Sequence, residues 1–217
     1  YTLSYTLSLH DALPIFIEIT HGPIEHVSET RELPHGEIGE ILVQAPSTTR
    51  EYFRRPDATA LAKVADDDGK FWHRMGDVGW FGDDDRLWFC GRKAHIVEAA
   101  SGRMFTIPCE AIFNEHPQVF RSALVGVGNG NGNGNGTGDA SAQKPVIIVE
   151  PEAGEFPESA TAEQKFRDEL LALGQASPLT DSIETVLFHR SLPVDIRHNV
   201  KIFREKLAPW AEEQLRK

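Results

Sequence analysis

The chain has 217 residues, with 33 acidic against 22 basic side chains and a formal net charge of −11. This acidic balance argues against nucleic acid as a partner, because a nucleic-acid-binding protein needs a basic surface to neutralise phosphates. No apolar run approaches the roughly 18 residues of a membrane span. Two cysteines, Cys90 and Cys109, are too few for a disulfide-stapled scaffold, and their spacing matches no metal-binding pair, so no metal site is expected from them.

The first fifteen residues differ from the rest of the chain. Tyr1–Ser4 recurs at once as Tyr5–Ser8, and the segment lacks the basic start and the small-residue cleavage site of a signal peptide. It resembles translated sequencing-adapter sequence joined to a gene. We therefore expect residues 1–15 to be a non-native or disordered leader without function.

Strand patterns dominate the part up to Arg92. Two strands, a short helix and a β-hairpin are predicted there, at Ile15–Thr20, Glu40–Gln44, Pro56–Lys63 and Trp80–Phe89. The hairpin turn carries three successive aspartates, which suit a turn.

Helices and strands are mixed in the part after Arg92. Three helices are predicted, at Pro108–His116, Thr161–Leu173 and Val200–Leu215, the last interrupted by Pro209. Three strands are predicted, at Arg121–Val127, Lys144–Glu150 and Thr185–His189. This change from mostly strands to mixed helices and strands indicates two units of α+β type, residues 16–92 and 93–217.

A tract of alternating glycine and asparagine begins at Gly128. It lacks the glycine spacing of a dinucleotide-binding loop and leads into another strand instead of a helix N-terminus. We therefore interpret residues 128–143 as a flexible insertion between two strands.

Two groups of residues are candidates for chemistry. Asp77 lies in a glycine-rich segment, and the hairpin brings Arg92 back toward it, so a carboxylate and a guanidinium can hold a diol from two sides. An ordinary surface ion pair, worth about 0–1 kcal/mol, explains the same spacing equally well. Lys201, near the chain end, is by default part of a solvated helix face.

Five motifs in order resemble the carboxyl-terminal part of the acyl-adenylate-forming (AMP-binding) superfamily. They are Gly36–Glu40, Trp72–Gly79 with Met75 where threonine is usual, Gly91–Arg92, Ile107–Glu110 with His116–Pro117, and Lys201–Leu207. The resemblance implies the end of a distorted β-barrel subdomain followed by a small, mobile α+β domain.

The resemblance also implies roles for particular residues. Asp77 and Arg92 are expected to contact the ribose of ATP, and Lys93 and Ala94 to form the hinge between the two domains. Lys201 is expected to act on the substrate carboxylate and the α-phosphate, where negative charge accumulates. Mg²⁺ would assist the departure of pyrophosphate, from a site lying mostly outside this chain.

One segment departs from the acyl-CoA synthetase pattern. Ala94 stands where aspartate or lysine is usual, and Ile96–Met104 lacks the usual lysine. The sequence around Asp77, Arg92 and Lys201 is most similar to that of the β-lactone synthetases of bacterial olefin biosynthesis. That branch adenylates a long-chain β-hydroxy acid, whose own hydroxyl then displaces AMP. A long-chain fatty-acyl-CoA ligase is the alternative.

Family members are much longer than this chain, and nothing in it resembles their phosphate loop, adenine segment or acyl pocket. We therefore expect a fragment that is inactive alone, taken from a cytoplasmic enzyme that works beside other olefin-pathway proteins. An inert module with only a binding or interaction role is the alternative from another class.

Overall fold

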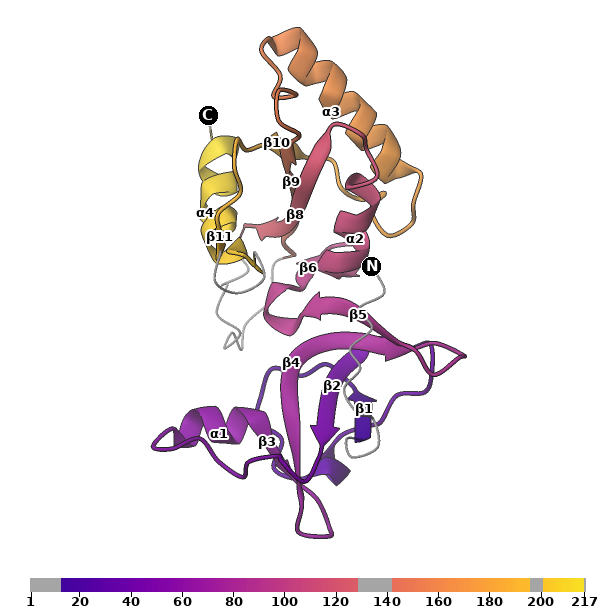
Figure 1. Cartoon of the computed structure of the whole chain (residues 1–217), viewed down its shortest axis with the longest axis vertical. Helices are drawn as coiled ribbons and strands as arrows, with labels where there is room; N and C mark the ends of the chain where they lie inside the picture. Colours follow the sequence, from indigo (N-terminus) through magenta and orange to yellow (C-terminus); the bar gives the residue numbers. More distant parts are fainter. Residues whose placement is uncertain (1–12, 129–141, 196–200, 217) are drawn as a thin grey trace. The chain divides into compact units, whose positions relative to one another are not determined.

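The computed structural model describes residues 13–128, 142–195 and 201–216. The chain divides into two compact units, one within Tyr1–Ala94 and the other within His95–Lys217. The described residues form a mixed α/β structure with four α-helices and several sheets (Figure 1). Most of the expected leader and of the glycine–asparagine insertion lies outside these residues.

The first unit is built on one five-stranded antiparallel sheet. Its strands are β1 (Leu13–Ile17), β2 (Gly39–Gln44), β3 (Lys63–Ala65), β4 (Phe71–Phe81) and β5 (Leu87–Arg92). Their order is β1-β2-β4-β3, and β5 pairs with the second half of β4. These described strands form an open sheet, so the distorted β-barrel subdomain whose end we expected is not confirmed.

Local sequence patterns explain most elements of this unit. The predicted helix is α1 (Pro56–Ala62), with proline in its first turn, and a 3₁₀ turn, η1, covers Val27–Glu29. The predicted hairpin is confirmed, since Trp80 pairs with Trp88 across β4 and β5 and their rings stack with centroids 5.7 Å apart. Residues 13–15 of the expected leader belong to β1 and pair with β2.

The second unit is a three-stranded sheet covered by helices on both faces. The sheet order is β10 (Val186–Phe188), β9 (Lys144–Pro151) and β8 (Val119–Val127). Helices α2 (Thr106–Phe113) and α3 (Ala160–Gln175) cover one face, and α4 (Arg204–Leu215) covers the other (Figure 1).

Strand periodicity divides the core of this unit into two clusters. Ile147 and Val149 face α2 and α3, whereas Val146 and Ile148 face α4. All four are buried, so β9 reads as a continuous apolar run although its side chains alternate between the two faces.

Two short ladders complete the second unit. A hairpin of β6 (Val97–Ala99) and β7 (Gly102–Met104) follows the 3₁₀ turn η2 (Lys93–His95), which spans the boundary between the units. Strand β11 (Val194–Asp195) pairs with β12 (Lys201–Ile202) directly before α4.

The predicted last helix needs two corrections. Helix α4 begins at Arg204, because Lys201 and Ile202 pair with β11 instead of entering the helix. It also continues through Pro209 without interruption. The buried side chains of Leu207 and Ala211, on either side of the proline, pack against the sheet and offset the lost backbone hydrogen bond. No helix among the described residues is long and apolar enough to cross a membrane.

Candidate functional site

Two β-bulges place Asp77 opposite Arg92. Between the pairs Leu42–Arg74 and Glu40–Val78, strand β2 has one residue whereas β4 has three, so β4 bulges at residues 75–77. Gly76 adopts φ +67° there, a conformation that favours glycine. On β5, Cys90 is the extra residue of a second bulge, beside Gly91 at φ +127°. Bulges of this kind redirect side chains and are common beside active sites.

Close backbone packing explains two other motif glycines. A Cβ at Gly79 would lie 2.3 Å from the carbonyl oxygen of Trp88, and a Cβ at Gly39 would lie 2.5 Å from that of Ile17. Any side chain at these positions would force neighbouring strands apart. Both glycines therefore maintain the strand pairing on which the bulges depend.

The structure brings Asp77 and Arg92 together, as their spacing predicted. They are cross-strand partners, and the Arg92 Nη1 atom lies 3.0 Å from Asp77 Oδ1. The same nitrogen donates a hydrogen bond to the carbonyl oxygen of Met75 at 3.3 Å. The Arg92 side chain is 50% exposed and that of Asp77 is 17% exposed. The guanidinium of the pair is thus open to solvent, whereas the carboxylate is mostly buried.

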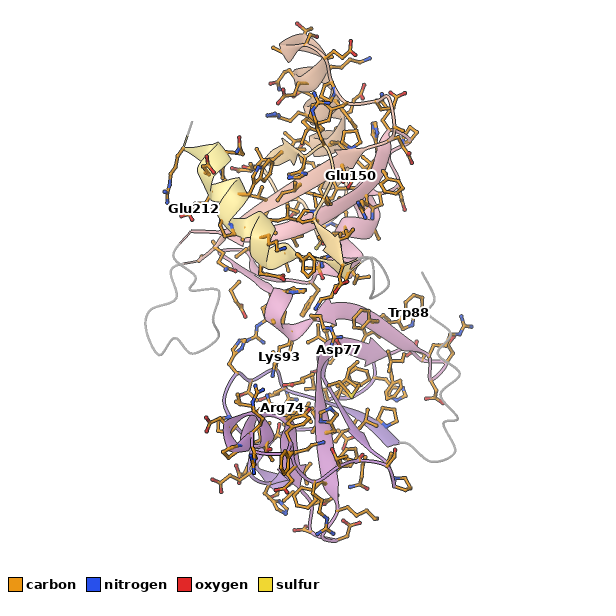
Figure 2. All side chains as sticks on the ribbon, turned by 60° about the vertical axis from the view of Figure 1, so that its left-hand side comes forward. Arg74, Asp77, Trp88, Lys93, Glu150 and Glu212 are labelled. Carbon is orange, nitrogen blue, oxygen red and sulfur yellow. The ribbon has the colours of Figure 1, made fainter. Side chains whose placement is uncertain are left out.

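A buried ionic network involves residues close to this pair in the sequence, Arg74 and Lys93. Glu40 is fully buried, and its carboxylate accepts hydrogen bonds from Arg74 Nε at 3.1 Å, Arg74 Nη2 at 2.8 Å and Lys93 Nζ at 2.8 Å. The carbonyl oxygens of Thr20 and Gly22 accept the remaining bonds of the two cations. Figure 2 labels Arg74, Asp77 and Lys93 around strand β4.

Lys93, one of the two expected hinge residues, is anchored in this network. Burial lowers the pKa of its ammonium group, and the carboxylate of Glu40 opposes that effect. The Lys93 side chain is only 18% exposed. Ala94, in contrast, has no side chain that can form an ion pair or hydrogen bond.

A pocket of about 240 Å³ lies near the β4 bulge in the same unit. Its lining includes Lys63, His73 and Met75, and neither Asp77 nor Arg92 lines it. Burial lowers the pKa of Lys63, whose amine hydrogen-bonds to Thr49, and also lowers the pKa of His73. These polar groups have partners within the unit, and we assign the pocket no function.

Lys201 lies in the second unit, exposed on β12. Its strand pairs with β11, where Asp195 is its cross-strand neighbour. Two residues later the backbone amide of Phe203 donates to the carbonyl of Pro193 at 2.9 Å. The amine is thus displayed at the start of α4, on a short ladder and not on a helix face.

Arg204 fixes the helix that follows Lys201. Its guanidinium contacts both carboxylate oxygens of Glu110 on α2, at 2.6 Å and 2.7 Å, and the amide of Leu124 on β8 donates to the same carboxylate at 2.8 Å. Burial raises the pKa of Glu110, and Arg204 opposes this effect. The pair therefore ties α4 to α2 and β8.

Sequence patterns did not reveal these buried ion pairs. Glu40 and Arg74 are 34 residues apart, and Glu110 and Arg204 are 94 apart. The available signal was a glutamate inside an otherwise apolar strand at Glu40, and another on the apolar helix α2 at Glu110. Among the residues that the structure describes, no group of three or more acidic, histidine or cysteine side chains is placed to hold a metal ion.

Comparison with known proteins identifies relatives along nearly the whole chain. The olefin beta-lactone synthetase of Xanthomonas campestris is 46% identical over 202 residues, covering 91% of this chain and 34% of that protein. The olefin beta-lactone synthetase of Stenotrophomonas maltophilia is 44% identical over 205 residues, again covering 34% of its length. The chain thus spans about a third of these curated relatives. No protein-family model matches it.

Solved structures match the fold over a similar extent. The amide bond synthetase McbA from Marinactinospora thermotolerans aligns with a TM-score of 0.69 at 25% identity, covering 93% of this chain and 34% of that one. The anthranilate CoA ligase AuaEII, in complex with anthranoyl-AMP, also aligns with a TM-score of 0.69; at 17% identity it supports the fold alone.

These matches place the chain in the acyl-adenylate-forming superfamily of ligases, as its ordered motifs predicted. Within that class it is a homologue of the olefin beta-lactone synthetases and corresponds to about a third of their length.

Proposed function

We propose that this chain is the carboxyl-terminal portion of an ATP-dependent ligase that adenylates a long-chain β-hydroxy acid and closes it to a β-lactone. The observation that carries the proposal is the Asp77–Arg92 pair, in a chain 44–46% identical to two olefin beta-lactone synthetases. In this proposal the first unit is the end of the large, barrel-containing domain and the second is the small mobile domain. The substrate would be a small-molecule fatty or β-hydroxy acid, handled beside other olefin-pathway enzymes.

Asp77 and Arg92 have the chemistry to hold the ribose of ATP. The carboxylate accepts hydrogen bonds from the two ribose hydroxyls, and the guanidinium donates to the same sugar. The bulge at residues 75–77 supports this role, because it turns Asp77 toward Arg92 on the neighbouring strand β5.

Lys201 would promote the first chemical step. The substrate carboxylate attacks the α-phosphorus of ATP, and pyrophosphate leaves with the electron pair of the broken P–O bond. Negative charge accumulates on the phosphoryl oxygens, and a positioned ammonium group stabilises it. Mg²⁺ would neutralise the departing pyrophosphate, but the described residues provide no ligand cluster for it, so we assign it no residue here.

The second step needs no external nucleophile. The β-hydroxyl of the acyl adenylate attacks its own carbonyl carbon and releases its proton to solvent, and AMP leaves with the electron pair of the broken carbon–oxygen bond as the four-membered ring closes. An intramolecular attacker has a high effective concentration, which makes a bound thiol unnecessary. The altered segment Ile96–Met104, folded as the β6–β7 hairpin, supports this outcome over thioester formation.

Product analysis tests the proposal and distinguishes the alternative. The chain would be joined to the preceding two thirds of the Xanthomonas relative and incubated with ATP, Mg²⁺, CoA and a long-chain β-hydroxy acid. We expect AMP and the β-lactone. Formation of the acyl-CoA would identify a long-chain acyl-CoA ligase instead, and the absence of any AMP would favour an inert module.

A further inference from the structure

Two sequence neighbours, Arg74 and Lys93, are joined to the Asp77–Arg92 pair through the backbone. Arg74 precedes Asp77 by three positions, at the start of the β4 bulge, and Lys93 directly follows Arg92. Both cations reach into the interior and contact the same carboxylate, that of Glu40. One buried side chain therefore contacts a cation close in sequence to each member of the pair, Arg74 on β4 and Lys93 directly after β5.

The bonding of Glu40 explains why this contact is more than general packing. Each carboxylate oxygen has a cationic partner, and one oxygen serves both Arg74 Nε and Lys93 Nζ. The backbone of residues 75–77 forms no regular ladder with β2, so on that side of β4 no strand pairing holds Asp77, whose cross-strand partner is Arg92 on β5. On the β2 side its position depends on the ends of the bulge, and Arg74 is one of those ends.

We propose that Glu40 is a positioning residue for nucleotide binding, which sets the separation of Asp77 and Arg92 by holding Arg74 and Lys93. This inference rests on the proposed function of that pair. It also assigns Lys93 to the fixed side of the expected hinge, because its amine is bonded within the first unit. Rotation would then begin at Ala94.

The central variant is Glu40→Gln, which keeps the size of the side chain but removes the charge that both cations share. The strands beside the bulge shift when that charge is lost, and a small displacement of a binding group has a large effect on affinity. We expect AMP to bind the 217-residue chain about tenfold more weakly, as measured by NMR titration. The variant Lys93→Met, which leaves the Glu40–Arg74 contact in place, is expected to weaken binding about threefold.

Glu150→Gln is the matched control. Glu150 is also buried, at 8% exposed, and accepts bonds from Arg121 and from the amide of Leu192, both in the second unit. Its loss is expected to lower stability while leaving AMP affinity unchanged. A general effect of burying an amide in place of a carboxylate would instead weaken AMP binding in both variants.

A double-mutant cycle separates positioning from a purely structural role. The double variant carries both Glu40→Gln and Lys93→Met. If Lys93 acts on the pair through its contact with Glu40, the double variant binds AMP no more weakly than Glu40→Gln alone, because that contact is already lost. Independent, multiplying effects would overturn the inference, as would AMP affinity within about twofold of wild type in a folded Glu40→Gln chain. If Glu40→Gln does not fold, Lys93→Met carries the test, and unchanged affinity there overturns it.

A second signal distinguishes failure of this inference from failure of the proposed function. The ¹³C resonance of the Asp77 carboxylate reports its surroundings without any ligand. We expect that resonance to shift in Glu40→Gln and to stay unchanged in Glu150→Gln. If wild type binds no AMP but the resonance shifts, the nucleotide assignment fails while the positioning contact stands; an unshifted resonance overturns the positioning.

Discussion

Lys201 is the single side chain on which the proposed chemistry depends most. It lies exposed on β12 in the second unit. An amine that acts mainly on the transition state changes the rate more than the binding. Its effect should therefore be visible in adenylation and weak in ATP affinity.

We expect Lys201→Ala to slow adenylation about 10²–10³-fold in the joined enzyme, while ATP affinity changes by less than about threefold. Pyrophosphate release measures the first quantity and calorimetry the second. Lys206→Ala, which removes an exposed lysine of helix α4 that lies over the Phe203 ring, is the control and should have little effect. Normal adenylation by Lys201→Ala would remove this lysine from the mechanism.

The Glu110–Arg204 pair makes a pH-dependent contribution to stability. We expect Arg204→Met to lower the free energy of unfolding by about 3–5 kcal/mol near neutral pH, because it leaves a buried carboxylate without its cation. Burial raises the pKa of Glu110 and the Arg204 cation lowers it, so this pKa rises further when Arg204 is removed. The folded variant then binds a proton that the unfolded chain releases, and its stability falls as pH rises from the ordinary carboxyl pKa toward the raised one.

Urea unfolding at pH 5 and pH 8 checks this expectation. The difference in stability between Arg204→Met and wild type should be smaller at the lower pH. Arg216→Met removes an exposed ion pair with Glu212 one helical turn away and should alter stability by less than about 0.5 kcal/mol at both pH values. A pH-independent loss in Arg204→Met would show that the pair contributes through packing alone.

At the scale of single elements, the β4–β5 hairpin depends on close approach of its strands. We expect Gly79→Ala to destabilise the first unit by about 1–3 kcal/mol, because the new Cβ would meet the Trp88 carbonyl oxygen, a backbone atom. Gly22→Ala is the control, since a Cβ there meets no atom within 4 Å. Equal urea midpoints for the two variants would contradict the close packing of β4 and β5.

Elements with a strong local pattern could be predicted from the sequence. The proline start of α1, the apolar stripe of α3 and the paired tryptophans of the hairpin are properties of neighbouring residues. The short strands β3, β6 and β7 were missed because pairing, and not their own composition, creates them. The start of α4 was misplaced for the same reason, since the pairing of β12 with β11 decides it.

The candidate site also has one part that local sequence predicts and another part that it does not. The hairpin is local, so it predicted that Arg92 returns to Asp77. The buried ionic network joins Glu40, Arg74 and Lys93 across 53 residues of sequence, and only folding of the first unit brings them together. Charged residues inside apolar strands were the one indication that such a network exists.

For the whole molecule, each unit has a hydrophobic core of its own. Ile17, Leu42 and Val64 belong to the core of the first unit, whereas the second has one cluster on each face of its sheet. The residues proposed to hold nucleotide lie in the first unit, and the residue proposed for catalysis lies in the second. In this account, adenylation requires both units.

Recognition of a sugar diol by Asp77 and Arg92 is the central claim of the proposed function. Calorimetric titration of the chain with AMP and with 2′,3′-dideoxy-AMP tests it most directly, because the two ligands differ only in the hydroxyls that the pair would contact. We predict that AMP binds at least about tenfold more tightly, and that Asp77→Asn removes most of this difference. Equal affinities for the two nucleotides, or no binding of AMP, would contradict the account.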